Sequence, residues 1–156
     1  MKKIVKGIRK YLKEGPWRGG GVLFYRRRPD GTLTILLFKR KHRPGKGRFS
    51  IPGGKFDRRY DRRLEDTGLR ELWEETSYRL EPTDIRGNIN LCWPGYRWRT
   101  VKVEFRGQLS DFDLWGAQDR ELSEVVEVTL TEAWRLPLTF PMRYTLVKSK
   151  IIGFLR

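Results

Sequence analysis

Two neighbouring stretches near the start of the chain, 20–27 and 32–39, contain short runs of apolar residues with polar residues at their ends. Short apolar runs bounded by turn residues are typical of β-strands. The tripeptide Pro29-Asp30-Gly31, which has the composition of a tight turn, separates the two stretches. We therefore predict a β-hairpin here. Strand-like patterns return around residues 85–92, 99–109 and 122–130.

Three other stretches have helical spacing. In residues 2–13 apolar positions recur every three or four residues among lysines and arginines, which indicates a basic amphipathic helix. RNA, a membrane surface and the protein's own sheet are candidate partners for it, and packing on the sheet is the favoured interpretation. Further helices are expected over about 63–78 and 141–154. Strands interleaved with a few helices predict an α+β or mixed α/β sandwich.

The length and composition of the chain fit one globular domain. It has 156 residues, of which 38% are hydrophobic, and we expect a single domain over 1–156. It has no apolar run of about 18 residues and no secretory signal, so we expect no membrane span and predict a cytoplasmic location. A single cysteine, Cys92, excludes an internal disulfide and a thiolate zinc cluster.

The net charge of +15 indicates an anionic partner, and the charge is unevenly distributed. Residues 39–63 hold eleven Lys or Arg and only two acids, whereas residues 107–132 hold seven acids and only one Arg. A pure nucleic-acid binder needs no acidic region. An enzyme that handles polyphosphate through divalent cations needs both signs of charge near one cleft.

Three glutamates, Glu71, Glu74 and Glu75, are spaced to project from one face of the expected helix over 63–78. Their mutual repulsion destabilises the helix unless cations lie among them. Carboxylate oxygens suit Mg²⁺ or Mn²⁺ better than zinc. Acidic helix faces are common, however, so the spacing alone favours a solvated stripe.

The residues around these glutamates change that balance. Gly53-Gly54-Lys55, followed by Arg70-Glu71-Leu72-Trp73-Glu74-Glu75-Thr76, resembles the Nudix box, and Phe49–Gly54 resembles the strand that leads into it. The chain is identified on these residues as a member of the Nudix (MutT-like) family. The resemblance implies an α/β/α sandwich with a mixed central sheet.

The box departs from the family pattern at three points. The segment from Gly54 to Arg70 is two residues longer than in the pattern. No Glu occupies the first acidic position, where Asp61 or Asp57 is the candidate replacement. Ser77 stands in place of the closing Gly, so we expect the helix to end in a different cap.

The resemblance implies a Mg²⁺-dependent (or Mn²⁺-dependent) pyrophosphohydrolase that cleaves a nucleoside diphosphate linked to another group. Glu71, Glu74 and Glu75 would bind the metal, and Arg70 would hold a glutamate carboxylate. Glu121 is the first choice as general base, with Asp119 and Glu124 as alternatives. The predicted substrate-binding residues are Arg40, Gly53, Gly54, Lys55, Trp93 and Tyr96.

The substrate within this class stays open. Pro94 resembles the proline of ADP-ribose hydrolases, whereas Tyr96 resembles the tyrosine of dinucleoside polyphosphate hydrolases. The Arg-rich insertion favours a substrate more negatively charged than ADP-ribose; its residues are Arg58, Arg59, Arg62 and Arg63. An alternative function keeps the fold but replaces small-nucleotide turnover by RNA binding or processing of RNA 5′ ends. The sequence does not indicate the oligomeric state.

Overall fold

The computed structural model of this protein describes residues 17–151. The basic helix predicted for residues 2–13 and the end of the chain, 152–156, lie outside the described residues. Within the described helices and strands, the side chains left undescribed are those of Pro82, Trp93, Ser149, Lys150 and Ile151.

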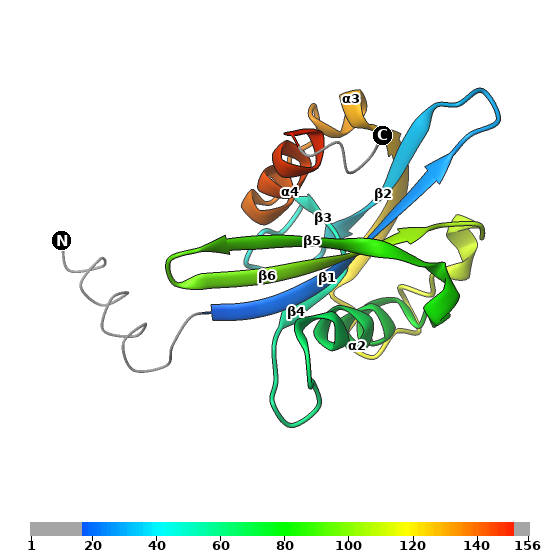
Figure 1. Cartoon of the computed structure of the whole chain (residues 1–156). Coiled ribbons are helices and arrows are strands. Elements are labelled where there is room, and N and C mark those ends of the chain that lie inside the picture. Colours follow the sequence, from blue (N-terminus) through cyan, green and yellow to red (C-terminus); the bar gives the residue numbers. More distant parts are fainter. Residues whose placement is uncertain (1–16, 152–156) are drawn as a thin grey trace.

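A mixed seven-stranded sheet forms the centre of the molecule (Figure 1). Its main path runs β3-β2-β1-β6-β5, while β4 pairs with β1 and β7 pairs with β2. The pairing of β1 with β6 is parallel, and all the other pairings are antiparallel. The strands are β1 (Trp17–Arg27), β2 (Leu33–Arg40), β3 (Phe49–Ser50), β4 (Gly53–Lys55), β5 (Ile85–Trp93), β6 (Tyr96–Glu104) and β7 (Leu122–Thr129).

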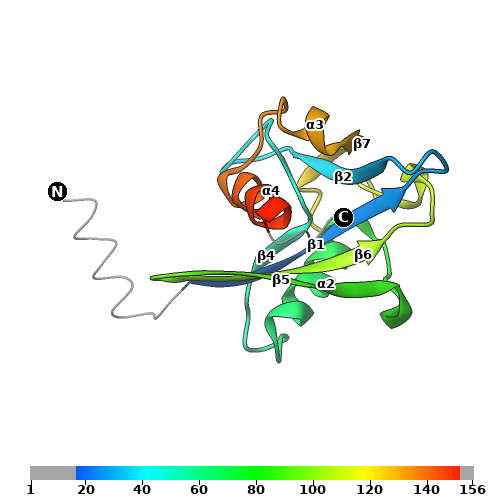
Figure 2. The same cartoon turned by 45° about the horizontal axis from the view of Figure 1, so that its top comes forward.

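Helices cover both faces of the sheet (Figure 2). Helix α2 (Leu64–Thr76) lies on one face, and α3 (Leu130–Ala133) and α4 (Phe140–Ile151) lie on the other. Short 3₁₀ turns, η1 (Pro82–Asp84) and η2 (Leu109–Asp111), complete the described elements. This arrangement confirms the α/β/α sandwich with a mixed sheet.

Two apolar clusters lie on opposite sides of the sheet, because the side chains along each strand point alternately to its two faces. Val22 and Phe24 of β1 pack with Leu72 of α2. The intervening Leu23 packs with Met142 of α4. Because successive strand residues point to opposite faces, one continuous apolar strand serves both helical layers.

The predicted hairpin is confirmed by the antiparallel pairing of β1 and β2, in which Tyr25 faces Ile35. The strand predicted for 99–109 is displaced, because β6 begins at Tyr96 and ends at Glu104. Gly95 adopts φ 82, so the chain reverses in a tight turn and Trp93 pairs directly with Tyr96. The apolar Phe105 lies just beyond the end of β6 and packs in the core.

The end of α2 differs from the expectation of a changed cap. Ser77 adopts the left-handed conformation, with φ 55, and its N–H donates to the carbonyl of Trp73 at 2.9 Å. This is the cap geometry in which glycine is usual. The backbone shape is therefore retained, and the serine accepts the steric cost of it.

Glycines hold α2 close to β1. A Cβ on Gly68 would lie 2.9 Å from the carbonyl oxygen of Gly21, and a Cβ on Gly20 would overlap the carbonyl of Leu64. The helix backbone therefore lies directly on the strand backbone. We call this contact of Gly20, Gly21 and Gly68 the glycine seam.

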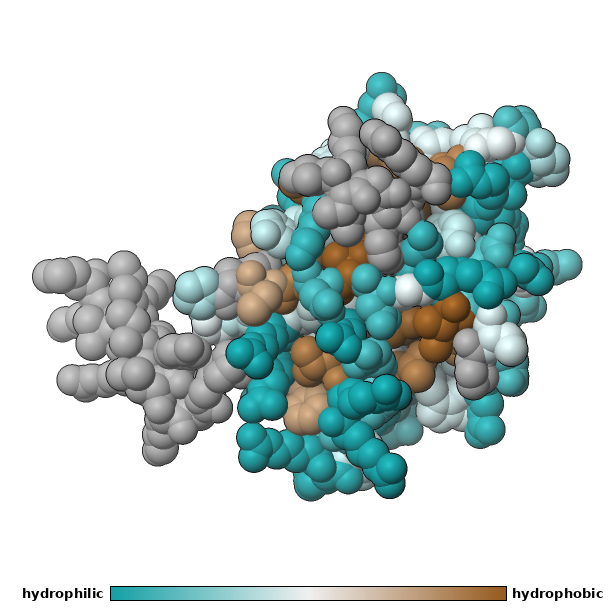
Figure 3. Space-filling view, viewed as in Figure 1, coloured by the Kyte–Doolittle hydropathy of each residue, from teal (hydrophilic) through white to brown (hydrophobic). Residues whose placement is uncertain are grey.

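The surface in Figure 3 is mainly hydrophilic, with its apolar residues in separate patches. Among residues 17–151, no helix is both long enough and apolar enough to cross a membrane.

Candidate active site

Arg70, on the exposed side of α2, is the centre of an ionic network. Its Nη1 donates to Glu71 Oε1 at 2.9 Å and to Glu74 Oε2 at 2.8 Å. Its Nε and Nη2 donate to the two oxygens of Asp61 at 2.9 and 3.0 Å. One guanidinium therefore orients three carboxylates. The pKa of Arg70 is raised, chiefly by the hydrogen bonds to Asp61.

Asp61, not Asp57, is the acid that holds Arg70. Its carboxylate also accepts hydrogen bonds from Thr67 Oγ1 and from the Asp57 backbone N–H, both at 2.9 Å. Burial opposes ionisation of Asp61, but these hydrogen bonds outweigh it and lower its pKa. Asp57 instead pairs with Arg59 at 2.6 Å in the Arg-rich insertion.

Three carboxylates form the candidate metal site. Glu71, Glu74 and Asp119 each offer an oxygen, and these oxygens all lie within 4.8 Å of one another. Burial raises the pKa of Glu71, and the nearby Glu74 and Asp119 add to this effect against the opposing charge of Arg70. A hard divalent cation fits this donor set, because it takes carboxylate oxygens and offsets their repulsion.

The approach of Glu71 depends on Gly54. A Cβ built on Gly54 would overlap the Glu71 carboxylate. Strand β4 is held in place by its antiparallel pairing with β1, where Gly54 faces Gly20. The second glycine of the box therefore makes room for a candidate metal ligand.

Glu75 occupies a different position from Glu71 and Glu74. Its side chain is buried, and its Oε2 accepts a hydrogen bond from the Gly53 N–H at 3.0 Å. Burial raises its pKa well above the ordinary value for glutamate, and the charges of Glu71 and Glu121 act in the same direction. Glu75 thus links α2 to β4, while the described carboxylate cluster contains Asp119 instead. A metal-binding role for Glu75 stays a prediction.

The candidate general bases lie within residues 119–124, just before β7 and at its start. Glu121 pairs with Arg40 at 3.1 Å, and Glu124 pairs with Lys39 at 3.3 Å. The backbone N–H of Asp119 donates to the Glu74 carbonyl at 3.0 Å, which fixes this segment against α2. Asp119 thereby enters the carboxylate cluster, whereas Glu121 lies beside Arg40 and its charge helps to raise the pKa of Glu75.

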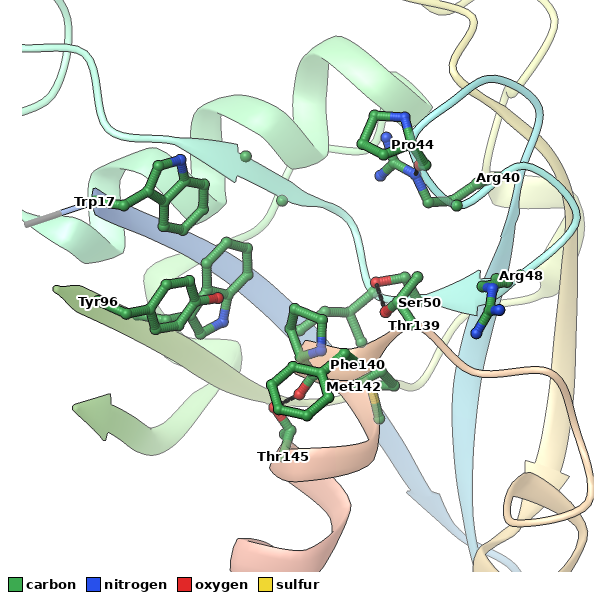
Figure 4. Close-up of a pocket in the computed structure, with 16 residues that line it drawn as sticks. Trp17, Arg40, Pro44, Arg48, Ser50, Tyr96, Thr139, Phe140, Met142 and Thr145 are labelled. Carbon is green, nitrogen blue, oxygen red and sulfur yellow. Dashed lines mark hydrogen bonds between the residues drawn. The ribbon is translucent and has the colours of Figure 1, made fainter. Parts of the chain in front are cut away.

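A cavity of about 490 Å³ adjoins this network (Figure 4). Trp17 and Tyr96 stack at one end, with ring centroids 4.9 Å apart, and Arg40 and Arg48 lie at the other end. Gly53 and Gly54 of β4 also line it. Because Gly54 also lies against the Glu71 carboxylate, β4 connects the cavity to the carboxylate cluster. The remaining lining residues are Pro44, Gly45, Ser50, Ile51, Trp98, Thr139, Phe140, Pro141, Met142 and Thr145.

The cavity contains four of the six predicted substrate-binding residues, namely Arg40, Gly53, Gly54 and Tyr96. Lys55 does not line it; its carbonyl accepts from Arg70 Nη2 at 3.2 Å. The side chain of Trp93 is outside the described part of the structure. The exposed arginines of the insertion do not line the cavity either. Their role in substrate binding stays a prediction.

Sequence reasoning missed Trp17, Trp98 and Arg48 as cavity residues. Trp98 was within reach of the alternation rule, because it lies two residues beyond Tyr96 on the same face of β6. Trp17 joins them only because it pairs with Tyr96 in the parallel register of β1 and β6. That pairing joins segments far apart in the sequence, and no local pattern indicates it.

The arrangement provides two chemically different surfaces that meet at β4. The aromatic end of the cavity can stack on a flat ring, and the guanidinium groups of Arg40 and Arg48 can bind phosphate oxygens. Among the described residues that line the cavity, none carries a carboxylate. The acids of the carboxylate cluster come instead from the second half of α2 and from the loop before β7, where they can hold a cation.

Solved structures with the same fold include several Nudix proteins. The chain is 21% identical to the NUDIX domain of Shewanella oneidensis NrtR complexed with ADP ribose, with a TM-score of 0.63 over 91% of this chain and 96% of that one. For the Nudix hydrolase RenU from M. Smegmatis, the identity is 19% and the TM-score 0.67, over 88% and 87%. For a C. elegans Ap4A hydrolase, they are 17% and 0.59, over 87% and 96%. No curated protein matches the sequence.

The sequence profile of the NUDIX domain matches residues 17–148. This span includes the box, the carboxylate cluster and all the described residues that line the cavity. The match confirms the resemblance that the box motif indicated. This chain therefore belongs to the family of Nudix hydrolases.

Proposed function

We propose that this protein is a Mg²⁺- or Mn²⁺-dependent pyrophosphohydrolase that cleaves the pyrophosphate linkage of a nucleoside diphosphate derivative. One observation carries the proposal. The carboxylate cluster of Glu71, Glu74 and Asp119 adjoins, through Gly54, a cavity with stacked aromatic rings and two arginines. A nucleotide has the matching parts, namely an aromatic base and a phosphate chain.

Glu71, Glu74 and Asp119 would hold the cation, and Glu75 stays a further candidate ligand. When bound, such an ion neutralises phosphate charge and lowers the pKa of a water molecule. Arg70 acts as a positioning residue, because its guanidinium is already engaged by Asp61, Glu71 and Glu74. A carboxylate held in place by fixed hydrogen bonds needs little reorganisation to bind a cation.

The cavity residues would bind the nucleotide. Trp17 and Tyr96 would stack on the base, and Arg40 and Arg48 would contact phosphate oxygens. Glu121, paired with Arg40 at 3.1 Å, would accept a proton from the attacking water as general base. The similar structures are named for ADP ribose and Ap4A, which both contain an adenosine diphosphate group.

A substrate screen tests this function directly. We would incubate the full chain with ADP-ribose, dinucleoside polyphosphates, oxidised deoxynucleoside triphosphates and 5′-capped RNA, each with Mg²⁺ or Mn²⁺. We expect hydrolysis of at least one nucleoside diphosphate derivative and its loss without divalent cations. RNA is included as the alternative substrate.

Three variants connect the activity to the proposed site: Glu71→Gln, Glu74→Gln and Asp119→Asn. Each keeps the side-chain size but removes a charge, so we expect turnover to fall by at least about a hundredfold, equivalent to about 3 kcal/mol of barrier. Glu81→Gln, a substitution of an exposed acid in a loop, is the matched control. Unchanged turnover in all three site variants would exclude the carboxylate cluster as the metal site.

A further inference from the structure

Trp115 is unusually exposed for its size and type. It is 72% exposed, although its neighbours Leu114 and Ala117 are buried. The loop is held by the Gly116 N–H, which donates to Asp113 Oδ1 at 2.7 Å, and by the Asp113 N–H, which donates to the Thr76 carbonyl at 2.9 Å. These contacts fix the backbone before and after Trp115, and the fixed backbone directs the indole outward.

A cation accompanies the exposed indole. Lys41 Nζ lies 5.3 Å from the centroid of the Trp115 ring. Within the described residues, Lys41 forms no ion pair with a carboxylate. An ammonium group beside an open aromatic ring is suited to a ligand that has both a flat ring and negative charge.

Trp115 is also tied to the proposed active site. It lies four residues before Asp119 of the carboxylate cluster. The Lys41 N–H donates to the Glu121 carbonyl at 2.8 Å, and the Glu121 carboxylate binds Arg40 at 3.1 Å. Arg40 lines the cavity, whereas Trp115 does not. The contacts therefore run from the cavity through Arg40 and Glu121 to Lys41 and Trp115.

We infer that Trp115 and Lys41 form a second aromatic subsite, which binds the far base of a dinucleoside polyphosphate. This inference rests on the proposed function and specifies the substrate class. The first base would stack in the cavity on Trp17 and Tyr96, and the phosphate chain would pass Arg40. The second base would stack on the open part of Trp115, with Lys41 beside the last phosphates. ADP-ribose has no second base and gains nothing from this subsite.

The test compares diadenosine tetraphosphate with ADP-ribose in Trp115→Ala. We expect the KM for diadenosine tetraphosphate to rise on the order of tenfold, as for loss of one aromatic platform for a base. The KM for ADP-ribose should stay unchanged. Trp115→Phe, which keeps a ring, should recover most of the loss. Trp134→Ala, at a second exposed tryptophan that follows directly after α3, is the matched control and should change neither value.

Equilibrium binding of both compounds, measured by calorimetry, keeps this test independent of turnover. If no nucleotide is hydrolysed by the unmodified protein, the proposed function fails, and the binding comparison still decides the subsite. Selective weakening of diadenosine tetraphosphate binding in Trp115→Ala would support the inference. Equal effects on both compounds, no effect on either, or no recovery in Trp115→Phe would overturn it.

Discussion

Replacing Asp61 by Asn isolates the contact between this buried acid and Arg70. The carboxylate is buried and accepts four hydrogen bonds, two of them from Arg70. Asn has nearly the same shape but carries no charge. It can still accept from Thr67 Oγ1 or the Asp57 N–H, but it can no longer bind Arg70 through two acceptor oxygens.

The structure sets the size of the expected effect. Removing one partner of a buried ion pair usually costs roughly 3–5 kcal/mol. Arg70 keeps Glu71 and Glu74 at 2.9 and 2.8 Å, which compensates for part of that loss. We therefore expect Asp61→Asn to lower the free energy of unfolding by about 2 kcal/mol at pH 7. In urea this corresponds to a midpoint shift on the order of 1 M.

The effect should depend on pH with a definite sign. The pKa of Asp61 is lowered in the folded protein, so the stabilisation is fully present above the unfolded pKa of about 3.9. It is lost as the pH falls through the lower, folded value. The difference between the unmodified protein and Asp61→Asn should therefore be large at pH 7 and shrink below about pH 4.

Urea denaturation at several pH values from about 7 to about 3 provides the measurement. Asp57→Asn is the matched control, because this acid lies in the same loop but pairs with the exposed Arg59. It should not reproduce the loss at pH 7. A stability difference for Asp61→Asn that is negligible at pH 7, or that grows as the pH falls, would refute this account of the contact.

Three further predictions concern the helix end, the glycine seam and the cavity. Ser77→Gly should raise the free energy of unfolding by about 1 kcal/mol by relieving the left-handed conformation, and a lower midpoint in urea would contradict this. Gly68→Ala should lower the free energy of unfolding by roughly 1–3 kcal/mol, because its Cβ would lie 2.9 Å from the Gly21 oxygen. The displaced helix should make the protein more sensitive to proteolysis and lower its turnover. Arg48→Ser should flatten the salt dependence of kcat/KM for polyphosphate substrates between about 50 and 200 mM salt more than the double substitution Arg58→Ser/Arg59→Ser, because Arg48 lines the cavity and the other two arginines do not. A larger effect of the double substitution would instead support phosphate binding by the Arg-rich insertion.

Much of the fold follows from local patterns in the sequence. The hairpin, the box helix and the closing helix each have their own periodicity, and the structure confirms their presence. The displaced strand shows where that reasoning fails. The strand predicted to begin at residue 99 begins at Tyr96, because the left-handed Gly95 lets β5 turn directly into β6.

The candidate site was predictable where its residues share one helix. Arg70, Glu71 and Glu74 meet because helical spacing places them together. Asp119 joins them through the loop before β7, and Trp17 reaches Tyr96 through a parallel strand pairing. Both contacts depend on tertiary structure. The sequence alone therefore predicted Glu75 as the third metal ligand, offered Asp119 only as an alternative general base, and gave no indication of Trp17.

Because of the glycine seam, the geometry of the candidate metal site depends little on which side chains fill the hydrophobic core. At the crossing of α2 and β1, the spacing is set by main-chain atoms, which are the same whatever side chains fill the two apolar clusters. Core residues such as Val22 or Leu72 can then change during evolution while the carboxylate-bearing turn of α2 keeps its distance from β4. The tolerance of substitution should accordingly differ sharply along β1, with the narrowest choice at Gly20 and Gly21 of the seam and a broader choice at the apolar positions that follow.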